Sequence, residues 1–134
     1  MDLTHLKTGQ VYQGLAILQG RRYPRETEFN TMFKDGWKFL ASIDGLTGQD
    51  YRVFSALMQR MDFGNWIRVS QETMAEELGL KRPAVTRSIN RLLKYNVIQR
   101  KREEVDKRRW MYRLNPQIGW KGKANQWMRV IGDD

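Results

Sequence analysis

The 134-residue sequence contains no cysteine and one histidine, His5. The lack of cysteine excludes disulfides, a thiol nucleophile and a Cys/His zinc site. A single histidine cannot supply the histidine pair that holds a metal beside a nucleophile in many phosphoryl-transfer enzymes. The composition fits a reducing compartment, so we expect a cytoplasmic protein that needs no metal or other cofactor.

Long apolar runs and phosphate-binding loops are also missing. No segment approaches the about 20 apolar residues that a membrane-spanning helix needs, and the N-terminus lacks the apolar core of a secretory signal. The G-x-x-x-x-G-K-[ST] loop of many ATPases is absent. Glu76 and Glu77 are adjacent, and neighbours on a helix point about 100° apart, so they do not form an acid–base pair. We therefore expect neither an enzyme nor a membrane protein.

Positive charge is present in excess, and it lies in one segment. The formal net charge is +9, from 24 Lys and Arg against 15 Asp and Glu. Residues 81–113 hold 12 of these cations and 3 of the acids, which alone gives +9, while residues 1–80 give −1 and residues 114–134 give +1. A concentrated positive field favours a polyanionic partner, most often a nucleic acid.

The pattern of apolar residues predicts a mixed α+β fold. Strands are predicted over 10–19, 29–33 and 66–69 and over the runs VIQRK and WMYRL, with a short helix over 35–44. A clear helix begins at Thr47, and another begins at Ser70 and ends at Gly79. Pro83 suits the start of the next helix, which stops near Asn96. The last segment, 119–130, reads as a strand followed by a short helix.

Two short helices joined by a tight turn form a helix-turn-helix, whose second helix enters the DNA major groove. On a helical wheel, one face of this second helix is apolar, and it is formed by Val85, Ile89, Leu92 and Leu93. The remaining surface is basic and rich in groups that read bases, since Arg pairs with guanine and Asn with adenine. The residues predicted to contact DNA from this helix and its approach are Lys81, Arg82, Pro83, Thr86, Arg87, Asn90, Arg91 and Lys94. Ser70 and Gln71, at the N-terminus of the preceding helix, are further candidates.

A strand hairpin with a charged connection follows the second helix, which makes the unit a winged helix. Basic residues flank the predicted tip of this wing, where they could meet phosphates or a minor groove. The candidate wing contacts are Arg100, Lys101, Arg102, Lys107, Arg108 and Arg109. The predicted fold is thus a winged helix-turn-helix with an additional N-terminal strand pair. Residues 1–27 form an arm and possible dimer contact, and residues 28–134 form the DNA-binding domain with a short C-terminal extension.

The sequence resembles the RepL-like plasmid replication proteins, a bacterial winged-helix family. The resemblance rests on FNTMF, on MAEELGLKRPAVTRSINRLLKYNVI and above all on YRLNPQIGWKGK, and it spans residues 28–124. It implies sequence-specific binding to plasmid DNA in replication initiation or its control, with host replication proteins as possible partners. The helix-turn-helix alone is shared with many regulators, so a MarR-like repressor that binds a promoter operator is the alternative.

RNA binding is a second alternative, but the basic excess lies on a helix and hairpin rather than on an open aromatic sheet, which favours duplex DNA. Winged-helix proteins usually bind palindromic or repeated sites as two-fold dimers, so a homodimer is expected, with the strands around 10–33 as the candidate interface. Trp37 and Trp66 are expected in the core. Trp120 and Trp127 are expected to fold back onto the domain.

Overall fold

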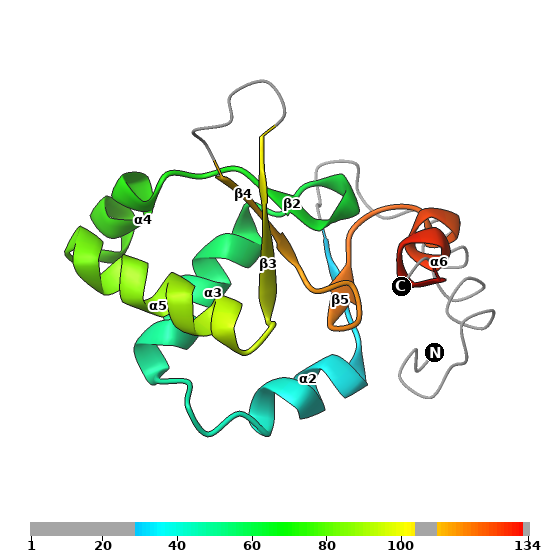
Figure 1. The fold of residues 1–134 in the computed structure, drawn as a ribbon, viewed down its shortest axis with the longest axis horizontal. Helices are drawn as coiled ribbons and strands as arrows, with labels where there is room; N and C mark the ends of the chain where they lie inside the picture. The colour runs from blue at the N-terminus through cyan, green and yellow to red at the C-terminus, as the bar shows by residue number, and fades with distance from the viewer. Residues whose placement is uncertain (1–28, 104–109, 133–134) are drawn as a thin grey trace.

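The computed structural model describes residues 29–103 and 110–132, and it shows a winged helix with a C-terminal extension (Figure 1). The predicted α+β winged-helix fold is confirmed. The elements in chain order are β1 (Thr31–Met32), α2 (Lys34–Ala41), α3 (Gly48–Gln59), the short 3₁₀ turn η2 (Phe63–Asn65), β2 (Trp66–Ile67), α4 (Gln71–Leu78), α5 (Arg82–Lys94), β3 (Ile98–Arg102), β4 (Trp110–Leu114), β5 (Gly119–Trp120) and α6 (Ala124–Gly132).

Helix ends follow local chemistry. Thr47 caps α3, and its hydroxyl accepts from the Asp50 N–H while Asp50 accepts from the Thr47 N–H, which completes a capping box with Asp in the place usual for Glu. The Ser70 hydroxyl accepts from the Thr73 N–H at the start of α4. Gly79 ends α4 at φ 66°, a left-handed conformation that costs a side-chain-bearing residue free energy.

The three helices α3, α4 and α5 pack around one core, and the sheet β2-β4-β3 covers it (Figure 1). Both strand pairs of this sheet are antiparallel, and Arg113 of β4 lies opposite Gln99 of β3 and Trp66 of β2. The fully buried side chains of this core include Val53, Leu57, Ile67, Met74, Val85, Ile89, Leu92, Ile98 and Leu114. The apolar stripe of α5 is thus the side of that helix turned inward.

The C-terminal extension is fastened to the winged helix by a buried amide. Asn65 is fully buried at φ 69°, and its Nδ2 donates to the carbonyls of Leu114 at 3.1 Å and Gly119 at 2.8 Å. Its Oδ1 accepts from the Lys121 N–H at 2.8 Å. One side chain in η2 therefore connects three points of the segment that leaves β4, runs through β5 and leads to α6.

A second, smaller cluster holds α6. Trp127 is 7% exposed and packs beside Phe33, and its indole N–H donates to the Pro116 carbonyl at 2.8 Å. The indole N–H of Trp120 donates to the Lys123 carbonyl at 3.1 Å. The prediction that both tryptophans fold back onto the domain is confirmed.

Three predictions about local structure need correction or restriction. Trp37 is 52% exposed on α2, so its expected place in the core is wrong, because α2 uses Gly36 and Leu40 for its buried side. The helix containing Pro83 begins one residue earlier, at Arg82. In the predicted N-terminal strand pair, residues 10–19 lie outside the described residues, and β1 pairs instead with β5.

Candidate nucleic-acid interface

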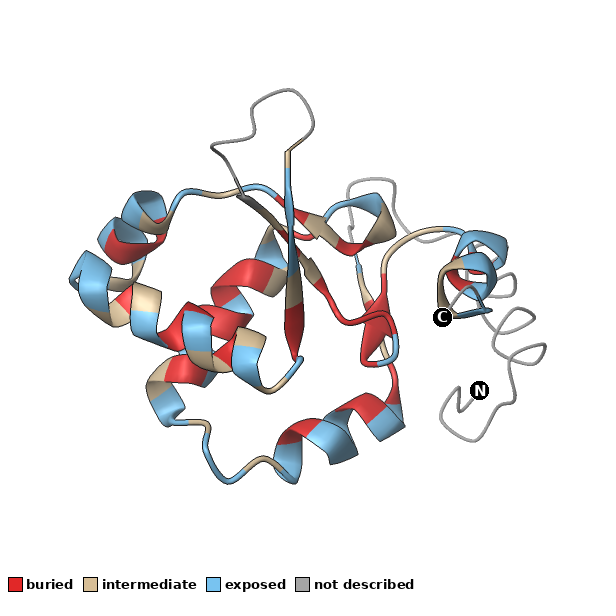
Figure 2. Cartoon of the chain, in the orientation of Figure 1, coloured by how far each residue is buried: buried red, intermediate tan, exposed pale blue. Residues whose placement is uncertain are grey.

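The outward side of α5 is uncovered, as Figure 2 shows by its colour. Polar and basic side chains stand opposite the buried stripe along the whole length of α5, and no other described element covers them. The predicted contacts that are exposed here are Lys81, Arg82, Pro83, Arg87, Asn90 and Lys94. Thr86 and Arg91 are half-buried. The helix therefore presents a cationic surface of the width that a major groove accepts.

Arg91 has a different environment from the other arginines of α5. Its Nε and Nη2 donate to the two carboxylate oxygens of Asp50 at 2.7 and 2.8 Å. The Asp50 side chain is fully buried, whereas that of Arg91 is 32% exposed. This bidentate pair joins the first turn of α3 to the last turns of α5, so Arg91 fixes α5 to the core.

The pair also sets the protonation of Asp50. Burial by itself raises the pKa of the Asp50 carboxyl, but hydrogen bonds from Arg91 and from the Thr47 backbone outweigh it and hold the pKa at about 2, below the usual 3.8. The hydrogen bond to Asp50 raises the pKa of Arg91. Both groups are charged at neutral pH, which makes this an ion pair with one partner removed from water.

The two candidates at the start of α4, Ser70 and Gln71, make different contacts. The Ser70 hydroxyl caps its own helix and also donates to the Thr73 hydroxyl. The Gln71 side chain lies between two elements, because its Oε1 accepts from the Thr86 hydroxyl of α5 and its Nε2 donates to the Tyr112 hydroxyl of β4 at 3.4 Å. Gln71 thus connects α4, the recognition helix and the wing.

The wing candidates are only partly described. Arg100, Lys101 and Arg102 are exposed on β3, whereas Lys107, Arg108 and Arg109 lie outside the described residues. Because side chains alternate along a strand, Arg100 shares a face of the sheet with Tyr112, its partner in register, and Lys101 lies on the opposite face. The cations of residues 81–113 therefore do not all gather on one surface.

Arg113 belongs to the outer face of the sheet. Its guanidinium lies 5.5 Å from the centre of the Trp66 ring, and its Nε donates to Gln99 at 2.7 Å. Trp66 was expected in the core, but it is half-buried under this arginine on the outer face of the sheet. A cation–π contact of this kind contributes about 0.5–1 kcal/mol at an exposed site.

One cationic residue at the interface escaped the sequence analysis. Arg68 follows β2, outside the basic segment, and it lines a cavity of about 620 Å³ between the wing and the helix-turn-helix. The residues that line the cavity are Arg68, Val69, Ser70, Gln71, Arg82, Glu103, Met111 and Tyr112. The only sequence signal would have been its place two residues before the Ser70 cap, which brings it to the N-terminus of α4.

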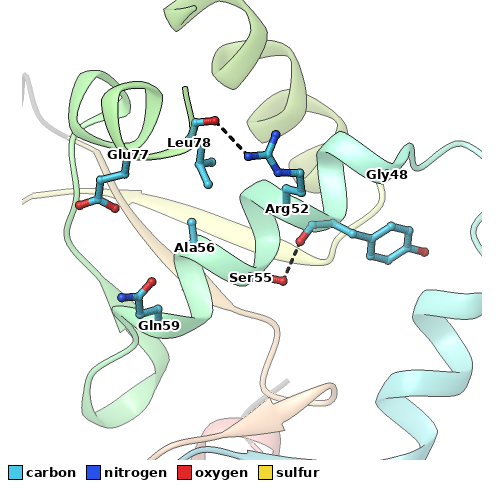
Figure 3. A pocket seen from close by; sticks show the side chains of 8 residues that line it. Gly48, Arg52, Ser55, Ala56, Gln59, Glu77 and Leu78 are labelled. Atoms are coloured by element: carbon cyan, nitrogen blue, oxygen red, sulfur yellow. Dashed lines mark hydrogen bonds between the residues drawn. The ribbon is translucent and has the colours of Figure 1, made fainter. Parts of the chain in front are cut away.

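A second hollow, of about 480 Å³, lies between α3 and α4 (Figure 3). The Arg52 guanidinium donates to the Leu78 carbonyl at 3.0 Å, and the Ser55 hydroxyl donates to the Tyr51 carbonyl at 2.9 Å. Arg52 thus binds the C-terminal end of α4, and Ser55 bonds back to its own helix. They offer a ligand few unused groups.

Two absences concern residues 29–103 and 110–132. In this part of the chain no three side chains of His, Cys, Asp or Glu gather as metal ligands. None of the described helices has the length and apolar character needed to cross a membrane.

Comparison with known proteins found a family similarity for the helix-turn-helix. A sequence model of the MarR family matches residues 44–109. No curated protein matches the chain significantly.

Three solved structures illustrate the similarity in fold. A point mutant of E. coli MarR complexed with operator DNA is 18% identical over 72% of this chain, with a TM-score of 0.42, and the match spans 63% of that MarR chain. The Streptomyces coelicolor regulator PcaV with its natural ligand is 19% identical over 93% of this chain and 70% of its own, with a TM-score of 0.42. S. aureus MepR bound to ethidium bromide is 13% identical over 96% of this chain and 77% of its own, with a TM-score of 0.44. Likeness at this level carries no conclusion about function.

The resemblance to RepL-like plasmid replication proteins is wrong. The family model that matches the helix-turn-helix is that of the MarR family, and the tail motif YRLNPQIGWKGK that carried the resemblance lies outside the match. In the structure this motif forms the turn held by Asn65 and Asn115, so it has a structural explanation. Replication initiation and partnership with host replication proteins lose their support with it. Residues 44–109, which contain α3, α4, α5 and β3, match the MarR family.

Proposed function

We propose that this protein is a MarR-type transcription regulator that binds duplex DNA in a sequence-specific manner and carries out no catalysis. The observation that supports this most strongly is the exposed polar face of α5, within a segment that matches the MarR family. The opposite face is fully buried, so the helix can be presented to DNA without loss of the core.

Within the interface, each group has a separate role. Arg87 and Asn90 lie at the middle of the exposed face and are proposed to read base edges, since they can make bidentate contacts to guanine and adenine. Lys81, Arg82 and Lys94 lie at the two ends of α5 and are proposed to contact phosphates. The basic residues of the wing add further phosphate contacts. About six such contacts would give a slope of log K against log salt of about −5.

The test begins with selection of bound sequences from a random duplex library, followed by titrations measured by fluorescence anisotropy. We expect Arg87→Ala to weaken binding by about 1–3 kcal/mol and to relax selectivity at one base pair. Arg129→Ala removes the same charge from the exposed surface of α6 and serves as the matched control. Unchanged affinity and selectivity in Arg87→Ala would refute the placement of α5 in the groove.

We also propose a homodimer on a two-fold symmetric operator. A single winged helix reads a short half-site, and two copies supply the rest. Besides the arm of residues 1–27, α2 is a candidate interface, because Trp37 and Phe39 are 52% and 38% exposed there. Light scattering should give about twice the monomer mass of 16.0 kDa. Trp37→Lys should shift the protein toward the monomer if α2 lies in the interface.

A further inference from the structure

The cavity between the wing and the helix-turn-helix contains a hydroxyl group whose hydrogen has no acceptor among the described residues. The Tyr112 side chain is only 6% exposed, and its oxygen accepts a hydrogen bond from Gln71 Nε2. An amide nitrogen has no lone pair to accept a hydrogen in return. With the amide nitrogen turned toward it, the Tyr112 hydroxyl keeps its hydrogen for another acceptor, and the cavity is the space that this residue lines.

The orientation of the Gln71 amide is itself set by α5. The Thr86 hydroxyl donates to Gln71 Oε1, so the carbonyl end of the amide faces the recognition helix and the NH₂ end faces the wing. The Thr86 hydroxyl has one hydrogen, and the Arg82 carbonyl at 3.1 Å is its second, more distant acceptor beside Gln71 Oε1. The chain of contacts Thr86–Gln71–Tyr112 thus directs the tyrosine hydroxyl as a donor.

The charges around this donor match one phosphate. Arg68 and Arg82 line the same cavity, and in the described part of the chain neither guanidinium forms a hydrogen bond or an ion pair. Glu103 also lines it and opposes an anion. Two guanidinium groups and one carboxylate leave a local charge of +1, which one phosphodiester group neutralises.

We propose that this cavity holds one phosphate of the DNA backbone, bound by Arg68, Arg82 and the Tyr112 hydroxyl, with Gln71 as the residue that positions the hydroxyl. The inference rests on the proposed DNA binding and assigns residues that the recognition helix alone does not supply. The site fixes how far the wing stands from α5 along the groove, because its donors come from both.

The experiment replaces one phosphate at a time in the selected DNA by an uncharged methylphosphonate. For the unaltered protein, we expect a loss of about tenfold at one position in each half-site, as for a charged hydrogen-bonded contact. Tyr112→Phe should bind unmodified DNA about three- to tenfold more weakly than the unaltered protein does. Methylphosphonate at the sensitive position should then reduce the affinity of this variant only slightly further. At every other position, its losses should equal those of the unaltered protein.

Salt dependence separates the two kinds of donor. Arg68→Gln removes a charge and should reduce the slope of log K against log salt by about 0.9, whereas Tyr112→Phe should leave the slope unchanged. Glu103→Gln should strengthen binding about two- to threefold, since it removes the opposing charge. If Tyr112→Phe does not fold, these two surface variants still test the site. Arg129→Gln on α6 is the matched control.

The outcomes distinguish this inference from the proposed function. Suppose that DNA binding depends on Arg87, and that every methylphosphonate reduces the affinity of Arg68→Gln and Tyr112→Phe as much as that of the unaltered protein. The phosphate site is then refuted and the proposed function stands. If no duplex is bound with any dependence on Arg87, the proposed function fails first. A methylphosphonate loss that shrinks at one and the same position in both variants supports the site.

Discussion

The ion pair between Asp50 and Arg91 should control the acid stability of the fold. Asp50 is fully buried with a pKa of about 2, below its ordinary 3.8. A carboxyl whose pKa is lowered in the folded state adds stability above its ordinary pKa, and that stability is lost as the pH falls through the lowered value. The contribution of Asp50 should therefore disappear between about pH 4 and pH 2.

The size of this effect follows from the shift. One pKa unit corresponds to about 1.36 kcal/mol, so the shift of Asp50 gives about 2 kcal/mol of unfolding free energy. Asp50→Asn keeps an acceptor for the Thr47 N–H but removes the ion pair. It should lower the unfolding free energy by about 2 kcal/mol at neutral pH. Arg91→Met should cost more, about 3–5 kcal/mol, because it leaves a buried carboxylate without its partner.

The loss of Arg91 should also weaken the pH dependence that Asp50 gives the fold. Without Arg91, the hydrogen bond and the charge of that residue no longer lower the pKa of Asp50 while burial still raises it, so Arg91→Met should gain less stability between about pH 2 and pH 4 than the unaltered protein does. Urea unfolding followed by tryptophan fluorescence from pH 2 to pH 7 measures this, and Asp50→Asn supplies the baseline for all other carboxylates. An Arg91→Met curve that rises from pH 2 to pH 4 as steeply as the unaltered one would refute the reasoning.

Three further outcomes concern stability and can be measured in the same unfolding assay. Asn65→Ala removes three buried hydrogen bonds and should cost about 3 kcal/mol or more, and a cost below 1 kcal/mol would contradict its role in holding the extension. Gly36→Ala should be strongly destabilising because the added Cβ would meet the Ile118 carbonyl at 2.3 Å, whereas Gly48→Ala, where that Cβ meets nothing within 4 Å, should be neutral or stabilising by up to about 1 kcal/mol. Trp37→Ala should lower the unfolding free energy of the monomer by about 2–3 kcal/mol, since about half of this large side chain is still buried.

The helices of this protein could be predicted because their signals are local. Thr47, Ser70 and Gly79 act within a few residues of their own positions, and the inward stripe of α5 is a property of one helix. The same holds for the exposure of Arg87 and Asn90. The positions of these helices, and the side of α5 that is buried, could therefore be predicted from local sequence signals and residue spacing.

Features that depend on distant partners could not be predicted. Arg91 lies on the polar side of its helix, and only the fold brings it to Asp50, 41 residues earlier. Arg68 lies in a part of the sequence without excess charge, and the cavity becomes visible only when β2, α4 and β4 meet. Trp37 shows the reverse error, since hydrophobic character predicted burial on a helix that buries only Gly36 and Leu40 among its eight residues.

The anchoring of the extension by Asn65 has a consequence for dissection of the molecule. A fragment cut at the borders of the family match, residues 44–109, would lose β4 and with it the Leu114 carbonyl, and also the two later partners of that amide. It would expose the apolar sides of Ile67 and Ile98 and leave a carboxamide facing nothing that can replace its lost partners. The smallest piece expected to fold alone must therefore run past Lys121, so the helix-turn-helix and the strand β5 should unfold together.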